Sequence, residues 1–170
     1  KDRPDEEIAA ATLAAFDEYS IDVVLLAGYL RRIPPEVTRR YAGRMLNIHP
    51  ALLPDFGGPG MYGMNVHRAV AESDATVTGA TVHFVDEAYD EGAILAQWQV
   101  ARLPGDTPEE IAARVLEVEH RLYPAAVDHL CAALREGTAP ERMADVRLDE
   151  PPDADRPESH PPHESNEEVR

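Results

Sequence analysis

The apolar and polar residues alternate in a way that predicts helices and strands in turn. Residues from about Pro4 to Tyr19 carry apolar side chains three and four positions apart, which is typical of an amphipathic helix. The next run, Ile21–Gly28, is almost continuously apolar and rich in β-branched residues. That composition favours a parallel strand buried on both faces. The apolar positions of the first helix are Ile8, Ala11, Ala15 and Tyr19.

The alternation continues through the middle of the chain. Short helices are predicted from Pro34 to about Tyr41 and over Val66–Ser73, and strands over Met45–His49, Gly79–Val85 and Ala93–Val100. The intervening residues 55–65 are too rich in glycine for a regular element. Their spacing matches neither of the common glycine motifs that bind phosphate, which favours a flexible lid.

A long helix is the most clearly marked element. It begins after Thr107, which is followed by Pro108 and, three residues after the cap, by Glu110. A threonine cap, proline at the first helical position and a glutamate at the third are signals of a helix start. Gly137 marks the end, and Pro124 is expected to bend the helix. Its apolar stripe is Ile111, Val115, Val118, Leu122 and Ala126.

These elements predict one α/β domain over residues 1–148, with an open, mostly parallel sheet flanked by helices. Residues 149–170 differ sharply in composition. They hold eight acidic and two basic residues, five prolines and almost no large apolar side chain. We therefore expect this segment to be a disordered acidic tail.

Charge and cysteine content narrow the function classes. The 32 acidic residues outnumber the 16 basic ones, for a formal net charge of -16. This balance argues against a general surface for nucleic acid or anionic membranes. Cys131 is the only cysteine in the 170 residues, so no intrachain disulfide can form. With no apolar run of roughly 20 residues, these features predict a cytoplasmic protein.

The candidate chemistry lies where the strand Met45–His49 ends. Side chains alternate along a strand, so Asn47 and His49 share one face with Met45. Pro50 cannot donate to a strand ladder, which places this amide and this imidazole at the end of the strand. Open α/β sheets have their binding crevices there.

Four sequence blocks resemble the folate-dependent formyltransferase family. They extend over nearly everything from the first predicted helix to about Gly137, in the family's order and spacing. The blocks are Leu25–Arg31, Asn47–Pro54, Gly79–Val85 continuing to Tyr89–Gly92, and Gly105–Thr107 together with Glu119–Pro124.

The resemblance implies transfer of a formyl group from 10-formyltetrahydrofolate to the amine of glycinamide ribonucleotide, a step of de novo purine biosynthesis. It implies no metal and no covalent enzyme intermediate. The matching positions imply that Asn47 donates to the developing oxyanion and that His49 is the general acid. Asp90 would keep the imidazole protonated, since an adjacent carboxylate raises a histidine pKa.

The family match also implies the binding residues. Leu30, Arg31, Arg32 and Ile33 correspond to the segment that lines the pterin pocket, largely through backbone groups. Asn47, Asp86 and Asp90 complete the folate site, the last two in the loop that closes over it. Glu119 corresponds to the residue that meets the substrate amine; otherwise it would pair with Arg114 or Arg121.

Simpler interpretations exist for single residues. Asn47 could cap a turn after the strand, and Asp90 could be an ordinary turn residue before Gly92. His83 is expected to be a hydrogen-bonded core histidine rather than a catalytic one. Trp98 and Cys131 are interpreted as core residues.

The chain also departs from the family pattern. The family begins with a strand and a glycine-rich loop that binds the ribonucleotide phosphate, and nothing similar precedes Lys1. We therefore expect an N-terminally incomplete sequence of low activity, with an uncovered edge at the strand Ile21–Gly28.

The same chemistry serves more than one kind of protein. The alternatives are a formyltetrahydrofolate hydrolase, a relative of methionyl-tRNA formyltransferase and a non-catalytic folate-binding remnant. The acidic C-terminus disfavours the tRNA enzyme, which should carry a basic nucleic-acid-binding domain. The expected partners are the small substrates alone, without nucleic acid or membrane, for a monomer or homodimer.

Overall fold

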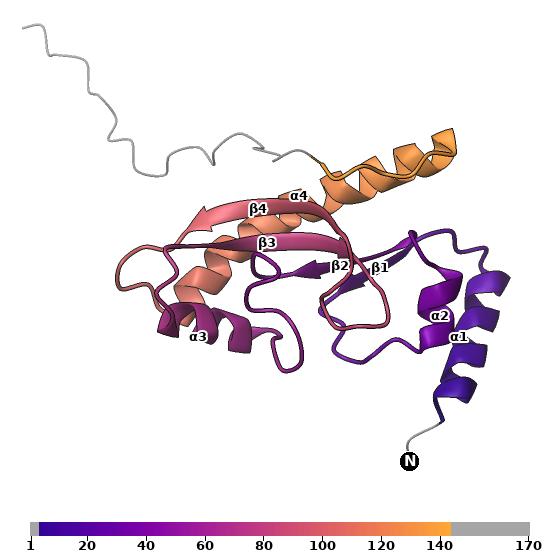
Figure 1. Cartoon of the computed structure of the whole chain (residues 1–170), viewed down its shortest axis with the longest axis horizontal. Helices are drawn as coiled ribbons and strands as arrows, with labels where there is room; N and C mark the ends of the chain where they lie inside the picture. The colour runs from indigo at the N-terminus through magenta and orange to yellow at the C-terminus, as the bar shows by residue number, and fades with distance from the viewer. Residues whose placement is uncertain (1–3, 144–170) are drawn as a thin grey trace, which may run out of the picture.

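A computed structural model describes residues 4–143, in which helices cover a four-stranded sheet (Figure 1). The acidic tail predicted over residues 149–170 lies outside the described residues. The elements follow the chain order α1 (Asp5–Glu18), β1 (Val24–Ala27), α2 (Pro35–Arg40), β2 (Met45–His49), α3 (Met64–Glu72), β3 (Val77–Phe84), β4 (Ile94–Ala101) and α4 (Pro108–Glu136).

The strands lie in the order β1-β2-β3-β4. β1 pairs with β2 in parallel, whereas β2 with β3 and β3 with β4 pair antiparallel. The α/β architecture is therefore confirmed, but the described sheet is mixed rather than mostly parallel. Short connections are the physical reason on the β3–β4 side, because a hairpin of nine residues between Phe84 and Ile94 can only join antiparallel neighbours.

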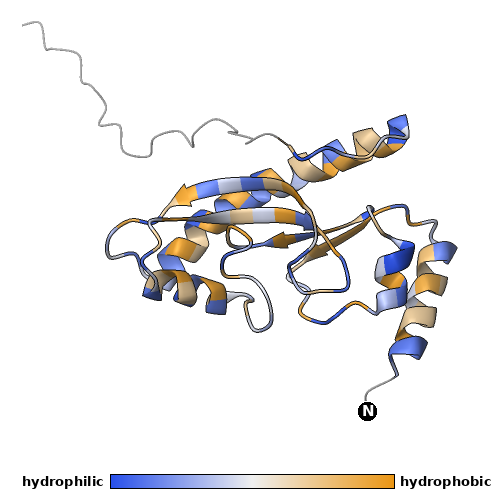
Figure 2. Ribbon diagram, in the orientation of Figure 1, coloured by the Kyte–Doolittle hydropathy of each residue, from blue (hydrophilic) through white to orange (hydrophobic). Residues whose placement is uncertain are grey.

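Two cores lie on the two faces of the sheet. α4 packs on β2, β3 and β4 and against α3, and Leu46 and Ile48 belong to this core. α1 and α2 pack together over β1 and the start of β2, with Met45 buried between them. The alternation predicted for β2 is therefore confirmed. Figure 2 shows the matching alternation of hydrophobic and hydrophilic residues along α1 and α4.

α4 has the ends that the sequence predicts. Thr107 accepts a hydrogen bond from the Glu110 backbone N–H, and the Glu110 side chain accepts one from the Thr107 backbone N–H. Gly137 ends the helix in the left-handed region at φ 70°. Pro124 lies inside the helix without ending it. Val118 of the predicted stripe is partly buried. The other four residues of the stripe are buried: Ile111, Val115, Leu122 and Ala126.

Two sequence predictions about the N-terminal part are wrong. The side of α1 that packs on the core carries Ala9, Leu13 and Phe16, not the predicted stripe, whose Tyr19 is 73% exposed. β1 is not covered on both faces, because Leu25 is 47% exposed. β1 is also the last strand at its edge of the described sheet. β1 therefore exposes apolar side chains that no described residue covers.

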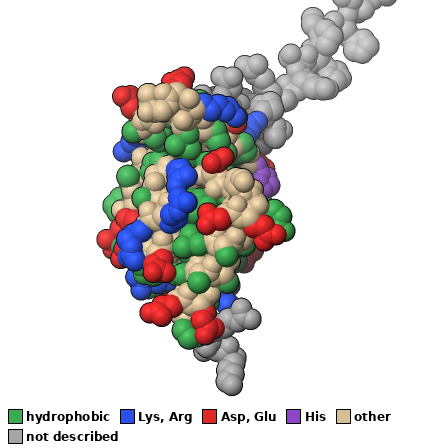
Figure 3. All heavy atoms as spheres, turned by 90° about the vertical axis from the view of Figure 1, so that its right-hand side faces the viewer, with side chains coloured by type: hydrophobic (Ala, Val, Ile, Leu, Met, Phe, Trp, Pro, Cys, Tyr) green, Lys and Arg blue, Asp and Glu red, His purple; other side chains and the backbone are tan. Residues whose placement is uncertain are grey.

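The surface near α1 and α2 carries both signs of charge. Figure 3 shows acidic and basic side chains distributed over this end of the molecule. Arg39 of α2 pairs with Glu87 at 2.8 Å, which connects α2 to the segment between β3 and β4. Arg40 lies 3.7 Å from Asp17 of α1. Within residues 4–143, no helix is both long and apolar enough to cross a membrane.

Tyr123 connects α4 to the two parallel strands. Its single hydroxyl proton is shared between two acceptors, the carbonyl oxygen of Leu26 in β1 at 2.9 Å and that of Leu46 in β2 at 3.1 Å. Burial raises the pKa of Tyr123 to about 12, although the Leu26 carbonyl opposes the shift. The phenol therefore connects α4 to β1 and β2 beside the polar cluster described below.

Tyr123→Phe should lower the free energy of unfolding by about 1 kcal/mol, because the hydroxyl is lost from a partly buried site. Urea denaturation measures this quantity. Tyr19→Phe is the matched control, since Tyr19 is 73% exposed, and it should leave the stability unchanged. Equal stabilities for the two variants would show that the Tyr123 hydroxyl does not hold the strands.

Candidate active site

The end of β2 delivers two polar side chains to the same place. Asn47 is partly buried and His49 is only 3% exposed. Antiparallel pairing with β3 sets Asn47 opposite His83 and His49 opposite Thr81. Thr81 in turn holds the turn after β2, because its hydroxyl donates to the Ala51 carbonyl at 2.7 Å.

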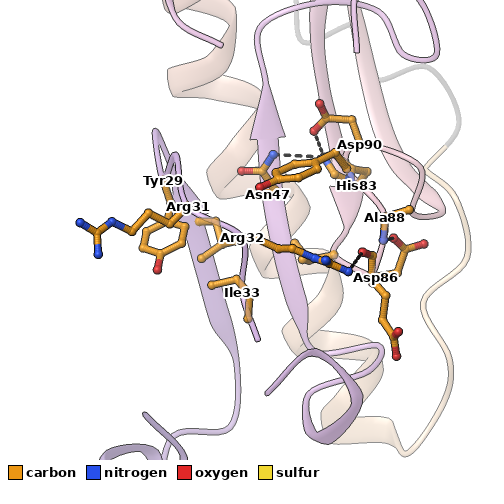
Figure 4. Close-up of a pocket in the computed structure, with 13 residues that line it drawn as sticks. Tyr29, Arg31, Arg32, Ile33, Asn47, His83, Asp86, Ala88 and Asp90 are labelled. Carbon is orange, nitrogen blue, oxygen red and sulfur yellow. Dashed lines mark hydrogen bonds and ion pairs between the residues drawn. The ribbon is translucent and has the colours of Figure 1, made fainter. Parts of the chain in front are cut away.

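Asp90 enters this cluster from the segment between β3 and β4. Its Oδ2 lies 3.7 Å from His49 Nδ1, and its Oδ1 lies 3.5 Å from His83 Nε2. The side chain is 13% exposed, and the Gly58 backbone N–H donates to Oδ2 at 2.9 Å. The structure therefore brings together Asn47, His49 and Asp90, which the sequence selected from separate segments. Figure 4 shows Asn47, His83 and Asp90 converging.

His83 is a member of this cluster that the sequence argument assigned to the core. It is buried and hydrogen-bonded, as expected: Nδ1 donates to the Phe84 carbonyl at 2.9 Å, and the Asn47 amide donates to Nε2 at 3.1 Å. However, these contacts also place its ring against both Asn47 and Asp90. The contact of His83 with Asn47 follows from the register in which β2 pairs with β3. That register requires antiparallel strands, whereas the sequence predicted a mostly parallel sheet.

Burial decides the charge of His49. It lowers the pKa of His49 below the ordinary value of 6.5, whereas the Asp90 carboxylate and the Phe56 carbonyl act in the opposite direction. The expectation of a raised pKa is therefore wrong, because the cost of charging a buried ring exceeds the attraction of one carboxylate. His67 nearby also has a lowered pKa, through burial and the charge of His49.

Asp90 stays ionised. Burial by itself would raise the pKa of Asp90, but the adjacent His83 ring, the hydrogen bond from the Gly58 amide and the charge of His49 together lower it. The cluster therefore combines a carboxylate with an imidazole that is readily neutral near pH 7. Such a pair can transfer a proton at neutral pH.

Two cavities meet at the cluster. A large one of about 850 Å³ lies between the end of β1, the glycine-rich loop and α4. A small one of about 80 Å³ lies between the segment after β1 and the segment between β3 and β4. Asn47 and Asp90 line both cavities. They therefore face both cavities at once.

The predicted folate-binding residues divide between the two cavities. Arg31, Arg32, Ile33 and Asp86 line the small cavity, whereas Leu30 lines the large one. Arg32 reaches across the small cavity, where its guanidinium donates to the Glu87 carbonyl at 3.0 Å (Figure 4).

Glu119 lines the large cavity from α4. Burial raises the pKa of Glu119, while the neighbouring His120 lowers it. Arg114, one of the partners proposed from sequence, is instead bound to Asp106 at 2.8 and 3.0 Å. No hydrogen bond or ion pair joins Glu119 to another residue of the described chain. Its carboxylate is thus available to a ligand.

The comparisons with known proteins agree with this geometry. Residues 2–127 match the family described as formyl transferase. The chain belongs to the formyl transferase family. This formyl transferase chain is 56% identical over 114 residues to the chloroplastic phosphoribosylglycinamide formyltransferase of Arabidopsis thaliana, covering 67% of the chain and 39% of that relative.

Other relatives give the same result. The phosphoribosylglycinamide formyltransferase of Escherichia coli strain K12 is 40% identical over 111 residues, 65% of the chain and 50% of that protein. A crystal structure of phosphoribosylglycinamide formyltransferase from Brucella melitensis superimposes with a TM-score of 0.68 at 45% identity, covering 77% of the chain and 65% of the solved chain. The formyl transferase chain thus spans about half the length of the curated relatives it matches.

Stability should fall as the pH drops below about 7. His49 and His67 have lowered pKa values in the folded protein, so between those values and 6.5 the unfolded chain binds more protons. Each histidine can change the free energy of unfolding by at most about 1.4 kcal/mol per pH unit. Urea denaturation from pH 8 to pH 5.5 measures this dependence.

His49→Gln should make this pH dependence less steep, because one of the two groups is removed. His129→Gln is the matched control, since His129 of α4 is partly buried, lies outside both cavities and donates to the Glu141 carbonyl. Identical pH slopes for the parent protein and His49→Gln would contradict the lowered pKa of His49.

Proposed function

We propose that this chain is the catalytic portion of a phosphoribosylglycinamide formyltransferase. It would transfer the formyl group of 10-formyltetrahydrofolate to the amine of glycinamide ribonucleotide, in de novo purine biosynthesis. The convergence of Asn47, His49 and Asp90 where two cavities meet is the observation that carries this proposal. Family membership and the names of the relatives support it.

The chemistry consists of one bond formed and one bond broken. The substrate amine attacks the formyl carbon, and a tetrahedral adduct with an oxyanion forms. The bond from the carbon to the folate nitrogen then breaks, the amine loses a proton and the folate nitrogen gains one. The protein must therefore stabilise the oxyanion and move a proton.

Asn47 and His49 are suited to the first of these tasks. The Asn47 amide is a neutral donor held in place by His83, so it can be directed at the oxyanion without reorganisation. A protonated His49 would stabilise the same charge and supply the proton for the folate nitrogen from Nδ1, the ring nitrogen that faces Asp90. Because its pKa is lowered, the protonated ring is a stronger acid, but a smaller fraction of the protein carries the protonated ring at neutral pH.

Asp90 is suited to the second task. It lies 3.7 Å from the His49 ring and remains ionised, so it favours the imidazolium as the adduct forms. Asp90 also lines both cavities, where it could accept the amine proton through water. The reaction written in this way uses no metal and no covalent enzyme intermediate.

The cavities suggest where each substrate binds. We assign the pterin to the small cavity, where Arg31, Arg32, Ile33 and Asp86 lie, with Leu30 at its border with the large cavity. The ribonucleotide would occupy the large cavity, with its amine near Glu119. A carboxylate that lines the large cavity attracts an amine, and a bound ammonium group would offset the burial that raises the pKa of Glu119.

The names of the relatives favour glycinamide ribonucleotide over a tRNA acceptor or water. We further propose a cytoplasmic enzyme with one catalytic domain and small-molecule partners only, as a monomer or homodimer. The cellular compartment is not taken from the relatives, because the Arabidopsis protein is named chloroplastic.

His49→Ala in the full gene product should lower kcat by about 10²- to 10⁴-fold, because the general acid is removed. The KM values for both substrates should change little, since the imidazole acts mainly in the transition state. Steady-state assays of formyl transfer to glycinamide ribonucleotide measure both constants.

His129→Ala is the control for this variant, because His129 lies outside both cavities and should leave kcat unchanged. A His49→Ala protein with the parent kcat would refute the proposed role of His49. Release of formate in place of transfer by the parent protein would instead support the hydrolase alternative.

A further inference from the structure

The glycine-rich loop contacts both partners of the His49–Asp90 pair through its backbone. His49 Nε2 donates to the Phe56 carbonyl at 2.8 Å, and the Gly58 N–H donates to Asp90 Oδ2 at 2.9 Å. The same carboxylate oxygen lies 3.7 Å from His49 Nδ1. Two loop residues that flank Gly57 thus hold the imidazole and the carboxylate from one side.

The Phe56 carbonyl determines which ring nitrogen of His49 carries a proton. Both the Phe56 carbonyl and the Asp90 carboxylate can only accept, but the carbonyl lies at 2.8 Å and the carboxylate at 3.7 Å, so Nε2 carries the proton in the neutral ring. The proton that is gained and lost is therefore the one on Nδ1, which faces Asp90. In the imidazolium both N–H groups face an acceptor. The loop backbone thereby assigns the exchangeable proton to a single nitrogen.

Gly57 lies where a side chain has no room. A Cβ atom there would lie 2.6 Å from Leu53 Cδ2 and 3.3 Å from Asp90 Cβ. Leu53 is 5% exposed, so its methyl group cannot move aside into solvent. Any side chain at position 57 would therefore push the loop away from Asp90. The two hydrogen bonds on either side of Gly57 would be lengthened together.

The backbone around this contact is unusual. Phe56 has φ 54° and Asp90 has φ 58°, both in the left-handed region that residues other than glycine seldom adopt. For an aromatic residue such a conformation is strained, and strain of this kind is concentrated at functional sites. Here it points the Phe56 carbonyl at His49.

We propose that the segment Phe56–Gly58 is a positioning element of the active site, whose carbonyl and amide fix the orientation of His49 and Asp90 and whose Gly57 permits the contact. This inference deepens the proposed function and rests on it for the kinetic consequence. The geometric part concerns the two hydrogen bonds alone.

Gly57→Ala tests the proposal, with Asp55→Ala as the matched control because Asp55 is exposed and lines neither cavity. Nitrogen-15 NMR of the histidine rings reports which nitrogen is protonated, and hydrogen exchange reports the Gly58 amide. The parent protein should show the Nε2–H form and a protected Gly58 amide. Gly57→Ala should show a mixture of ring forms and faster Gly58 exchange.

The kinetic effect should be confined to kcat. A misplacement of this size can lower kcat by about 10²-fold, whereas both KM values should stay within a few-fold of the parent. Leu53→Val removes the methyl group that would clash, so the double variant Gly57→Ala/Leu53→Val should recover most of kcat and the Nε2–H form. A general loss of stability would not be rescued in this way.

Each outcome distinguishes this proposal from the proposed function. A parent protein with the Nδ1–H form overturns the positioning role, even where Gly57→Ala does not fold. A folded Gly57→Ala protein with the parent ring form and kcat overturns it as well. Changed ring forms in a protein whose parent transfers no formyl group would support the positioning role and contradict the proposed function.

Discussion

The antiparallel pairing of β2 with β3 is the constraint on which the site depends. Asn47 and His83 face each other only in this register, and the Asn47 amide then donates to the His83 ring. The segment after β3 returns past the end of β2 and places Asp90 beside His49. A shift of one residue would turn every side chain of β2 to the opposite face. Apolar Leu46 and Ile48, buried under α4, make such a shift costly.

A balance of two electrostatic effects gives the cluster its chemistry. Burial opposes charge on His49, while the ionised Asp90 favours it. The imidazole consequently loses its proton more readily than a solvent-exposed histidine, while Asp90 favours its protonated form. Charge that develops in the neighbouring cavity is one such change. The same reasoning explains why the loop carbonyl of Phe56 matters, since it adds a second acceptor to the ring.

Local signals in the sequence were sufficient for some elements and not for others. The ends of α4 follow from Thr107, Glu110 and Gly137, which act on their own backbone neighbours. β2 was predicted with its correct bounds because Pro50 and the alternation of Met45–His49 are also local features. The direction of β3 and β4 depends on pairing between distant segments, which hydrophobic periodicity does not encode. The exposure of Leu25 likewise depends on which segments pack against β1, and hydrophobic periodicity does not encode this either.

The sequence likewise predicted only part of the site. The family blocks select Asn47, His49 and Asp90, and the structure brings these three together. They do not show that His83 lies against Asn47, because that contact follows from the strand register. Nor do they give the sign of the His49 pKa shift, since the sequence contains the carboxylate but not the degree of burial. The roles of these residues remain proposals that rest on geometry.

A crystal structure of the full gene product with a stable analogue of 10-formyltetrahydrofolate tests the central claim most directly. The account predicts that the formyl oxygen lies about 3 Å from Asn47 Nδ2 and that the formyl-bearing atom faces His49, with the pterin in the small cavity. A formyl group bound away from both Asn47 and His49 would contradict it.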